Sequence, residues 1–368
     1  MTASGQPPYR AEHVGSLLRP KELTQAFRAF NKGELPEDQF HKVQDNAIKE
    51  VVALQESLGL ELVTDGEFRR ASYWGHWVDA IDGLEVGEAV FKFSDAEGNE
   101  VPFTAAMCTA KLCKAKPIST EEFKYLKSVA HATPKITMPS PSTLHFYGLH
   151  RTVESSPYES DAAFMDDLCA IFAQEISDLY DLGCRYVQLD EVPLIMLGNP
   201  NIRERTAELG YDPEDVIDLY IKAMNDACGG RPEGMVAGMH MCRGNFKGRW
   251  LTTGGYDDIA EKVFGEVDVD AFFLEYDTDR AGTFAPLKHV PKGKKVVLGI
   301  VSSKLATLED AARLKERIKE AAQYVPLEDL SISPQCGFAS TVAGNPVDVD
   351  VEKAKLGLLV DVAKEVWG

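Results

Sequence analysis

The sequence has 368 residues, of which 44% are hydrophobic, and its formal net charge at pH 7 is −19. This composition excludes a disordered chain and suffices for one barrel-sized domain or two ordinary ones, while the strong negative charge excludes nucleic acid as an expected partner. No apolar run approaches the about 18 residues needed to cross a membrane, and the seven scattered cysteines do not form a secreted disulfide framework. We therefore expect a cytoplasmic protein with reduced thiols and no membrane contact.

Two short strands are predicted near the amino terminus, each followed by residues suited to a binding site. The first, 11–16, ends in Gly15 and Ser16, and backbone N–H groups at such a strand-to-helix turn bind anions. Helical periodicity follows at 20–30 and 36–58. The second strand, 60–64, precedes Asp65-Gly66-Glu67 and an aromatic cluster of Tyr73, Trp74, His76 and Trp77. Charged residues at a strand end, followed by aromatic ones, indicate a site more than a core.

Residues 82–117 do not fit an alternation of strands and helices. They predict a hairpin-like insertion, with strands at 90–93 and 101–114 around a turn at 95–99. Cys108 and Cys113 lie within it. They are either a metal-binding pair or, as we favour, two unrelated thiols on a surface ribbon. A helix is predicted next, at 119–130.

From Lys135 onward, strands alternate with helices in a regular rhythm. Strands are predicted at 135–144, 185–189, 235–239, 271–274, 295–301 and 330–333, and helices at 161–182, 213–228, 256–264, 308–325 and 351–367. With the two amino-terminal strands this makes about eight, which is typical of a (β/α)₈ barrel. A doubly wound open sheet is disfavoured, because no glycine-rich dinucleotide or phosphate loop follows any strand. We expect one α/β barrel domain over 1–368, with the insertion after its second strand.

Several of these strands end in residues that bind soft metals. His240 and Cys242 stand two positions apart on an extended segment and therefore emerge on the same side. Glu275 ends the sixth strand and Cys336 the eighth, and the carboxyl ends of barrel strands meet at one mouth. Zinc takes about four ligands of these types. Each residue also has a plainer interpretation, with Cys336 as a buried thiol and Glu275 as the partner of Arg280.

These residues carry a resemblance to a known family. His240-x-Cys242, Glu275 and Cys336-Gly337, together with Asp65-Gly66-Glu67 and Gln188-Leu189-Asp190-Glu191, resemble the catalytic domain of cobalamin-independent methionine synthase, most closely its short single-domain relatives. The resemblance spans nearly the whole chain, and the combined motif is specific although each fragment is not. It implies a methyltransferase of methionine biosynthesis in which Zn²⁺, held by His240, Cys242, Glu275 and Cys336, activates the thiol of homocysteine, because a zinc-bound thiol is deprotonated.

The resemblance also implies how the amino acid part of homocysteine is bound. The backbone around Val14, Gly15 and Ser16 would hold its carboxylate. The side chains of Glu67 and Asp190 would hold its ammonium group through charge-assisted hydrogen bonds.

The methyl donor is where this sequence departs from the family. The full-length enzymes carry a second barrel that helps to hold a polyglutamylated folate, and they place a proton-donating His after the seventh strand, where this sequence has Lys304. A tertiary amine leaves only when protonated, whereas a methyl group on cobalt needs no acid. The expected donors are therefore 5-methyltetrahydrofolate, with Lys304, His145 or His76 as the acid, or a corrinoid protein or another methyl carrier. Tyr147 stands where the family has a folate-stacking aromatic residue, so we expect it to contact the donor.

Three alternatives remain. A zinc-dependent thiol alkyltransferase of the epoxyalkane:coenzyme M type would need Arg243, Arg69 or Arg70 to face the sulfonate of its substrate. Arg69 or Arg70 would otherwise form internal ion pairs with Asp190 and Glu191. A zinc-stabilised binding protein would have a closed four-ligand site without a cavity. The uroporphyrinogen decarboxylases, which are related barrels, lack a zinc set and are disfavoured.

Overall fold

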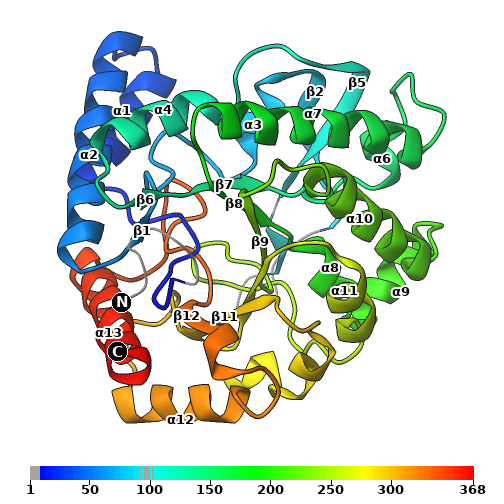
Figure 1. Cartoon of the computed structure of the whole chain (residues 1–368). Helices are drawn as coiled ribbons and strands as arrows, with labels where there is room; N and C mark the ends of the chain where they lie inside the picture. Colours follow the sequence, from blue (N-terminus) through cyan, green and yellow to red (C-terminus); the bar gives the residue numbers. More distant parts are fainter. Residues whose placement is uncertain (1–8, 92, 95–99, 102) are drawn as a thin grey trace.

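Six parallel strands form the main sheet of this computed structural model, which describes residues 9–91, 93–94, 100–101 and 103–368. In spatial order they are β12 (Leu330–Pro334), β11 (Lys295–Val301), β10 (Ala271–Glu275), β9 (Val236–Met241), β8 (Tyr186–Asp190) and β7 (Ile136–Pro139). Figure 1 shows helices around the outside of these strands, which explains why the strands are buried on both faces. The register sets Asp190 of β8 beside His240 of β9.

Further parallel contacts continue the arrangement beyond both edges of the main sheet. At one edge, β1 (Leu62–Val63) pairs with β6 (Thr133–Pro134), which leads directly into β7. At the other edge, Ala11 forms a parallel bridge with β12. The two outer segments meet where the Thr64 hydroxyl donates a hydrogen bond to the Gly15 carbonyl at 2.7 Å. The predicted α/β fold with parallel sheets is confirmed.

The helices begin where the local sequence favours it. The longer ones are α1 (Lys21–Asn31), α2 (Glu37–Ser57), α4 (Thr120–Val129), α7 (Asp161–Asp181), α10 (Pro213–Cys228), α12 (Ala311–Ala321) and α13 (Val349–Trp367). The shorter ones are α3 (Gly75–Val78), α5 (Thr143–Phe146), α6 (His150–Val153), α8 (Pro193–Met196), α9 (Pro200–Glu208) and α11 (Ala260–Glu266). Side chains that accept a first-turn N–H cap five of them: Ser160, Asn199, Asp212, Asp310 and Asp348. No helix in the described part of the chain is long and apolar enough to cross a membrane.

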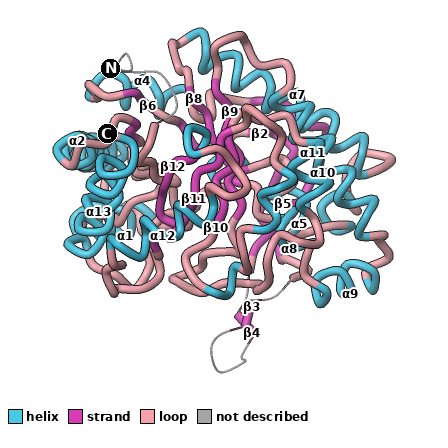
Figure 2. The backbone as a smooth tube through the Cα atoms, turned by 60° about the horizontal axis from the view of Figure 1, so that its bottom comes forward, coloured by secondary structure: helices cyan, strands magenta, loops and turns pink. Residues whose placement is uncertain are grey.

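The segment expected to be an insertion contains antiparallel ribbons. The pairs are β2 (Ile81–Glu88) with β5 (Thr104–Lys114) and β3 (Phe93–Ser94) with β4 (Glu100–Val101). In the view of Figure 2, β3 and β4 lie at the periphery of the molecule. The strand expected at 90–93 is confirmed only at Phe93, which pairs with Val101, while Val90 and Phe91 are not in a strand. Most of the expected strand at 101–114 pairs instead with the earlier segment β2, whose register is irregular between Asp82 and Leu84. The expected turn at 95–99 lies outside the described residues.

Two further expectations concern single segments. Cys108 is buried and Cys113 is exposed, although both lie on β5, and neither belongs to the metal-binding group described below, so they do not act as a metal-binding pair there. The strand expected over 135–144 ends at Pro139, since Pro139 and Pro141 have no N–H group to donate to a sheet, and α5 begins soon afterwards.

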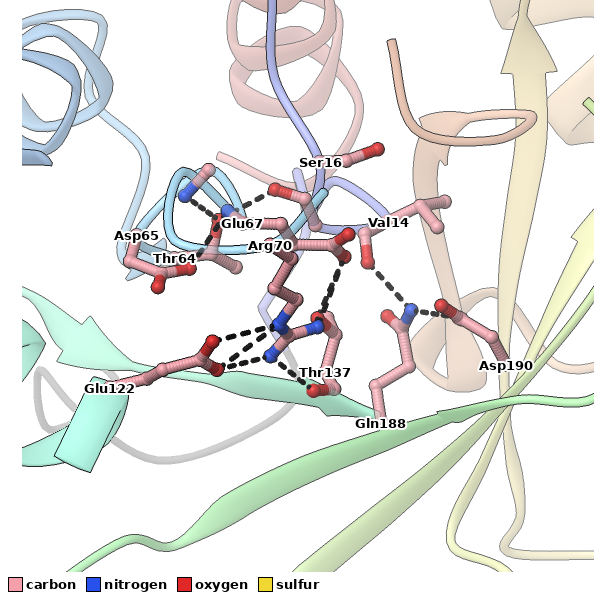
Figure 3. Close-up of polar contacts among 12 residues, drawn as sticks. Val14, Ser16, Thr64, Asp65, Glu67, Arg70, Glu122, Thr137, Gln188 and Asp190 are labelled. Atoms are coloured by element: carbon pink, nitrogen blue, oxygen red, sulfur yellow. Dashed lines mark hydrogen bonds and ion pairs between the residues drawn. The ribbon is translucent and has the colours of Figure 1, made fainter. Parts of the chain in front are cut away.

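A buried ion pair fixes the loop that follows β1. Arg70 is 1% exposed, and its guanidinium donates to both carboxylate oxygens of Glu122 on α4 at 2.6 to 3.1 Å. It also donates to the backbone carbonyl of Thr137 on β7 at 2.7 Å (Figure 3). Because an unpaired buried charge is strongly destabilising, this pair holds the loop, α4 and β7 together.

Replacing Glu122 by glutamine therefore leaves Arg70 without its main partner. We expect Glu122→Gln to lower the free energy of unfolding by about 3 kcal/mol in urea denaturation. The matched control is Glu121→Gln, one position earlier on α4, where the exposed pair with Lys124 at 2.5 Å contributes less than about 0.5 kcal/mol. Equal losses of unfolding free energy in the two variants would contradict the conclusion that the pair of Arg70 with Glu122 holds this loop.

Candidate active site

Three soft-metal ligands converge where β9 and β12 end. His240 lies on β9, Cys242 is the first residue after β9, and Cys336 lies two residues beyond β12. One ligand atom from each lies within 4.8 Å of the others, and the two sulfurs are 3.6 Å apart. All three side chains are buried. An imidazole and two thiols in this arrangement form a donor set that suits zinc.

Asp190 orients the imidazole of His240. Its Oδ1 lies 3.1 Å from Nδ1 of His240, while Nε2 lies 3.3 Å from the carbonyl oxygen of Gln335. Burial alone would lower the pKa of His240, but hydrogen bonds to Asp190 and Cys336 raise it to about 10. Because a carboxylate holds Nδ1–H, Nε2 is the nitrogen that can lose its proton and then bind a metal.

The pKa values of the two thiols are shifted in opposite directions. A hydrogen bond from Cys242, together with nearby His240, lowers the pKa of Cys336 well below its ordinary value although burial opposes this. The same contact and burial raise the pKa of Cys242. Cys336 is therefore the first of the two to become the thiolate that metals bind.

Glu275 lies outside this group of three. Its carboxylate accepts a hydrogen bond from the backbone N–H of Arg243 at 2.8 Å and pairs with the guanidinium of Arg280. Burial would raise the pKa of Glu275, but Lys304, Arg243 and Arg280 lower it to about 2. The structure thus shows the pairing with Arg280 that was the plainer interpretation, and a role as fourth metal ligand stays a prediction.

A cavity of about 210 Å³ opens beside the three ligands. Its lining includes the expected substrate-binding residues Val14, Ser16, Glu67 and Asp190 and the expected donor-binding residue Tyr147. The other lining residues are Ser72, Tyr73, Trp74, Phe103, Thr104, Val192, His240, Cys242, Gly244, Asn245, Phe246, Cys336, Gly337, Ser340 and Thr341. A closed structural metal site without a cavity is therefore disfavoured.

Gly15 does not line the cavity but shapes the segment that does. Its φ is +145°, and a Cβ there would lie 2.5 Å from Cγ2 of Thr137. A Cβ on Gly337 would likewise lie 1.9 Å from the hydroxyl of Ser16. The backbone N–H of Phe338 donates to the Ser16 carbonyl at 2.9 Å. Glycine at position 15 lets the amino-terminal segment pack directly against β7, and glycine at position 337 lets it pack against the loop that carries Cys336.

Glu67 is held in place from several sides (Figure 3). It has a left-handed φ of +60°, its N–H donates to Asp65 at 2.8 Å, and its carboxylate accepts from the hydroxyl of Thr137 at 2.8 Å. Burial and nearby Asp190 raise the pKa of Glu67 to about 7, against the effect of Arg70. A strained backbone and a raised pKa in a cavity wall are typical of a functional residue.

The internal ion pairs considered for Asp190 and Glu191 are not formed. Arg70 pairs with Glu122, and Arg69 pairs with Asp45. Asp190 instead accepts a hydrogen bond from the side-chain amide of Gln188 at 2.8 Å. Glu191 accepts from the hydroxyl of Ser140 at 2.6 Å and from Ser142 and does not line the cavity.

None of the three acids considered for the donor lines the cavity. His145 lies 2.9 Å from the Tyr220 hydroxyl and 3.2 Å from Asp161. Burial holds the pKa of His76 well below its ordinary value. The Nζ of Lys304 is buried without a hydrogen-bond partner, and its charge lowers the pKa of both Glu275 and Cys336.

Part of the aromatic wall was not predicted. The cluster after β1 contributes Tyr73 and Trp74 to the cavity, as expected of a site, but Phe103 and Phe246 come from the β5 ribbon and the loop after β9. Phe103 packs edge-on against Tyr147 at 4.8 Å and against Phe246 at 6.4 Å between ring centroids. No local pattern marks these two residues, because the strand pairing of the ribbon decides where Phe103 lies and the loop after β9 decides where Phe246 lies.

Comparisons with known proteins agree with this site. A family model described as the cobalamin-independent synthase catalytic domain matches residues 10–365. The uncharacterized protein YxjH of Bacillus subtilis is 38% identical over 367 residues, covering 98% of this chain and 95% of that protein. The methionine synthase of Pyrococcus horikoshii is 26% identical over 326 residues, covering 88% of this chain and 85% of that protein.

Two solved structures are also similar. A candidate vitamin-B12-independent methionine synthase from Listeria monocytogenes is 33% identical, with a TM-score of 0.77 and complete coverage of both chains, 100% each. A B12-independent methionine synthase from a Shewanella species, in complex with selenomethionine, has a TM-score of 0.75 at 19% identity, covering 97% of each chain, which supports the fold alone.

The chain is accordingly an enzyme of the methyltransferase class. It belongs to the cobalamin-independent synthase catalytic-domain family. Because this family is cobalamin-independent, the comparisons give no support to the corrinoid protein that was considered as a methyl donor.

The donor set predicts that the protein binds zinc. We expect about one zinc per chain by elemental analysis, and at least a tenfold loss of zinc affinity in Cys242→Ser and in Cys336→Ser, because each removes a thiolate ligand. Cys113→Ser, at an exposed thiol of β5, is the control and should keep its zinc. Full zinc retention in both ligand variants would exclude the site.

Proposed function

We propose that the protein transfers a methyl group to the thiol of homocysteine and so forms methionine, with zinc as cofactor. One observation carries the proposal: a single cavity presents His240, Cys242 and Cys336 next to the carboxylates of Glu67 and Asp190. The first three are ligands for a metal that binds thiols, and the other two suit an ammonium group. Homocysteine carries both a thiol and an ammonium group.

The zinc would be held by His240, Cys242 and Cys336, with Glu275 as the proposed fourth ligand. Zinc bound there would keep an incoming thiol deprotonated at neutral pH. The protein's own part is to hold these ligands in a buried place and to balance their charge. Lys304 supports this role, since its charge acts on both Cys336 and Glu275.

The amino acid end of homocysteine would lie between Ser16 and the two carboxylates. Backbone N–H groups around Val14 to Ser16 are proposed to bind its carboxylate. Glu67 and Asp190 line the same cavity and would accept hydrogen bonds from its ammonium group. The repulsion between these two carboxylates, which raises the pKa of Glu67, is relieved when a cation binds between them.

For the methyl donor we propose a reduced folate that stacks against the aromatic wall near Tyr147. Among the described lining residues there is no lysine or arginine, so nothing described there would attract a polyglutamate tail. The leaving nitrogen needs a proton, and we propose Lys304 as its source although it lies outside the described lining, because its Nζ has no hydrogen-bond partner. His145 is a weaker candidate because Tyr220 and Asp161 engage its ring nitrogens.

The epoxyalkane:coenzyme M alternative fits the cavity less well. A sulfonate needs a cation, but the guanidinium of Arg243 points to backbone carbonyls, donating to Gly254 at 2.6 Å and to Glu275 at 3.3 Å. Arg69 pairs with Asp45, Arg70 pairs with Glu122 and Glu67, and neither arginine lines the cavity. The two lining carboxylates would repel a sulfonate, which favours the amino acid.

We also propose that the parallel strands form one closed (β/α)₈ barrel over 1–368. The Ala11 bridge to β12 and the pairing of β1 with β6 place parallel segments next to both edges of the six-stranded sheet. The bond from Thr64 to Gly15 joins these segments to each other. Closure of the ring would bring all strand ends to one mouth.

A direct assay compares methyl donors and acceptors. We expect methyl transfer from 5-methyltetrahydrofolate to homocysteine, with kcat/KM for the monoglutamate and triglutamate forms equal within about threefold, a difference below 1 kcal/mol. Coenzyme M should be a poor acceptor. Methionine formation is measured by mass spectrometry, with the Cys336→Ser protein as the negative control. A faster reaction with coenzyme M and an epoxide would support the alternative instead.

The pKa of Glu67 predicts how binding depends on pH. Below about 7 its carboxyl is neutral, and above this pH it is charged, so methionine, whose side chain does not titrate, should bind more tightly as pH rises through 7. Glu67→Gln should weaken methionine binding by about 10- to 100-fold above pH 7 and flatten this dependence, because a charge-assisted hydrogen bond is lost. Calorimetry at pH 6 and pH 8 measures both effects. An unchanged pH profile in Glu67→Gln would contradict the assignment.

A further inference from the structure

A buried lysine lies behind the site, at the start of β7. Lys135 is 0% exposed, and its ammonium donates to the carbonyl of His13 at 2.5 Å and to Oε1 of Gln188 at 2.9 Å. It lies 4.0 Å from the buried carboxylate of Glu12 and 4.7 Å from the ring centroid of Phe273. None of these contacts is with the cavity, so the proposed reaction leaves this cation without a role.

Lys135 determines which way the side-chain amide of Gln188 points. An ammonium group has only donors, so the amide must present its oxygen to Lys135. Its nitrogen then faces the opposite way, where it donates to the Val14 carbonyl at 2.6 Å and to Oδ1 of Asp190 at 2.8 Å (Figure 3). With the amide reversed, its single oxygen would face the two acceptor oxygens of Val14 and Asp190, and both hydrogen bonds would be lost.

The consequences of this orientation reach three parts of the site. The Val14 carbonyl belongs to the segment proposed to bind the homocysteine carboxylate. Oδ1 of Asp190 is the same atom that lies 3.1 Å from Nδ1 of His240. Through the His13 carbonyl, Lys135 also holds the amino-terminal segment directly. One cation therefore sets the positions of the carboxylate-binding backbone, of Asp190 and of His240.

We propose that Lys135 is a positioning residue that, by orienting Gln188, aligns Asp190 and His240 with the amino-terminal segment for metal and amino acid binding. The effect on the metal rests on the ligand set described above. The effect on the amino acid rests on the proposed function. Lys135 does not line the cavity, and its hydrogen bonds reach the site through Gln188 and the His13 carbonyl.

The test uses the full-length chain with both charges removed. Lys135→Met alone leaves Glu12 buried without its cation, so the main variant is Glu12→Gln with Lys135→Met, in which no unpaired charge remains. We expect about tenfold weaker zinc binding in chelator competition and about tenfold weaker methionine binding in calorimetry, as for other residues that orient metal ligands. A changed visible spectrum of the cobalt(II)-loaded protein should report the altered ligand geometry.

Two further variants separate positioning from a general loss of stability. Lys355 on α13 is another fully buried lysine, and it donates to the Thr307 carbonyl and to the carboxylate of Glu309 in the segment between β11 and α12. Lys355→Met should leave zinc and methionine binding unchanged. Adding Gln188→Met to the main variant should cause no further loss, because Lys135 acts through Gln188. If zinc or methionine affinity fell by a further tenfold or more in this triple variant, the proposal that Lys135 acts through Gln188 would be overturned.

The outcomes are distinguishable. Wild-type zinc affinity, cobalt spectrum and methionine affinity in the folded main variant would overturn the proposal. Weaker zinc binding and an altered cobalt spectrum would support it even if the wild-type protein did not bind methionine, a result that would count against the proposed function alone.

Discussion

The contact between Asp190 and His240 is the interaction on which the rest of the site depends. It exists because β8 and β9 pair in parallel with these two residues side by side. The contact turns one nitrogen of the imidazole toward a carboxylate and leaves the other near Cys336. The same carboxylate lines the cavity that is proposed to receive an ammonium group. The proposed metal binding and the proposed amino acid binding would thus be linked through one side chain, as is common where a carboxylate supports a metal-binding histidine.

Around this contact, buried charges are arranged in two networks with different tasks. Arg70, with Glu122 and the backbone of Thr137, ties the loop that carries Glu67 to α4 and β7. Lys135, with Glu12 and Gln188, is buried directly before β7 and outside the cavity lining. Neither cation lines the cavity, so both position the residues that form its wall and neither contacts a molecule bound in it. Charged groups this deeply buried persist only where each has its partners, which accounts for the tight positioning of the residues between them.

The cavity itself combines features that suit one class of substrate. Two carboxylates in a lining whose described residues include no lysine or arginine favour a cation, although Arg70 lies 3.7 Å from Glu67 behind that lining, and the three soft ligands favour sulfur. The aromatic residues on the remaining wall offer flat apolar surfaces to a second substrate. Membership in the cobalamin-independent synthase family agrees with this combination. The main departure is Lys304, which takes the place expected for a proton-donating histidine but lies buried outside the cavity lining.

From the sequence alone, periodicity predicted the alternating strands and helices, and the placement of polar residues at strand ends predicted the convergence of His240, Cys242 and Cys336. These features are local or follow from the common polarity of parallel strands. The tertiary structure decided what local patterns do not contain. It decided that Glu275 pairs with Arg280 and that Lys304 and His145 lie outside the cavity lining. It also decided that Phe103 reaches the cavity from the β2–β5 ribbon, because the sequence periodicity did not reveal how these strands pair. It also decided that Lys135 orients Gln188 across 53 positions of sequence, because the partner of a buried charge depends on packing between distant segments.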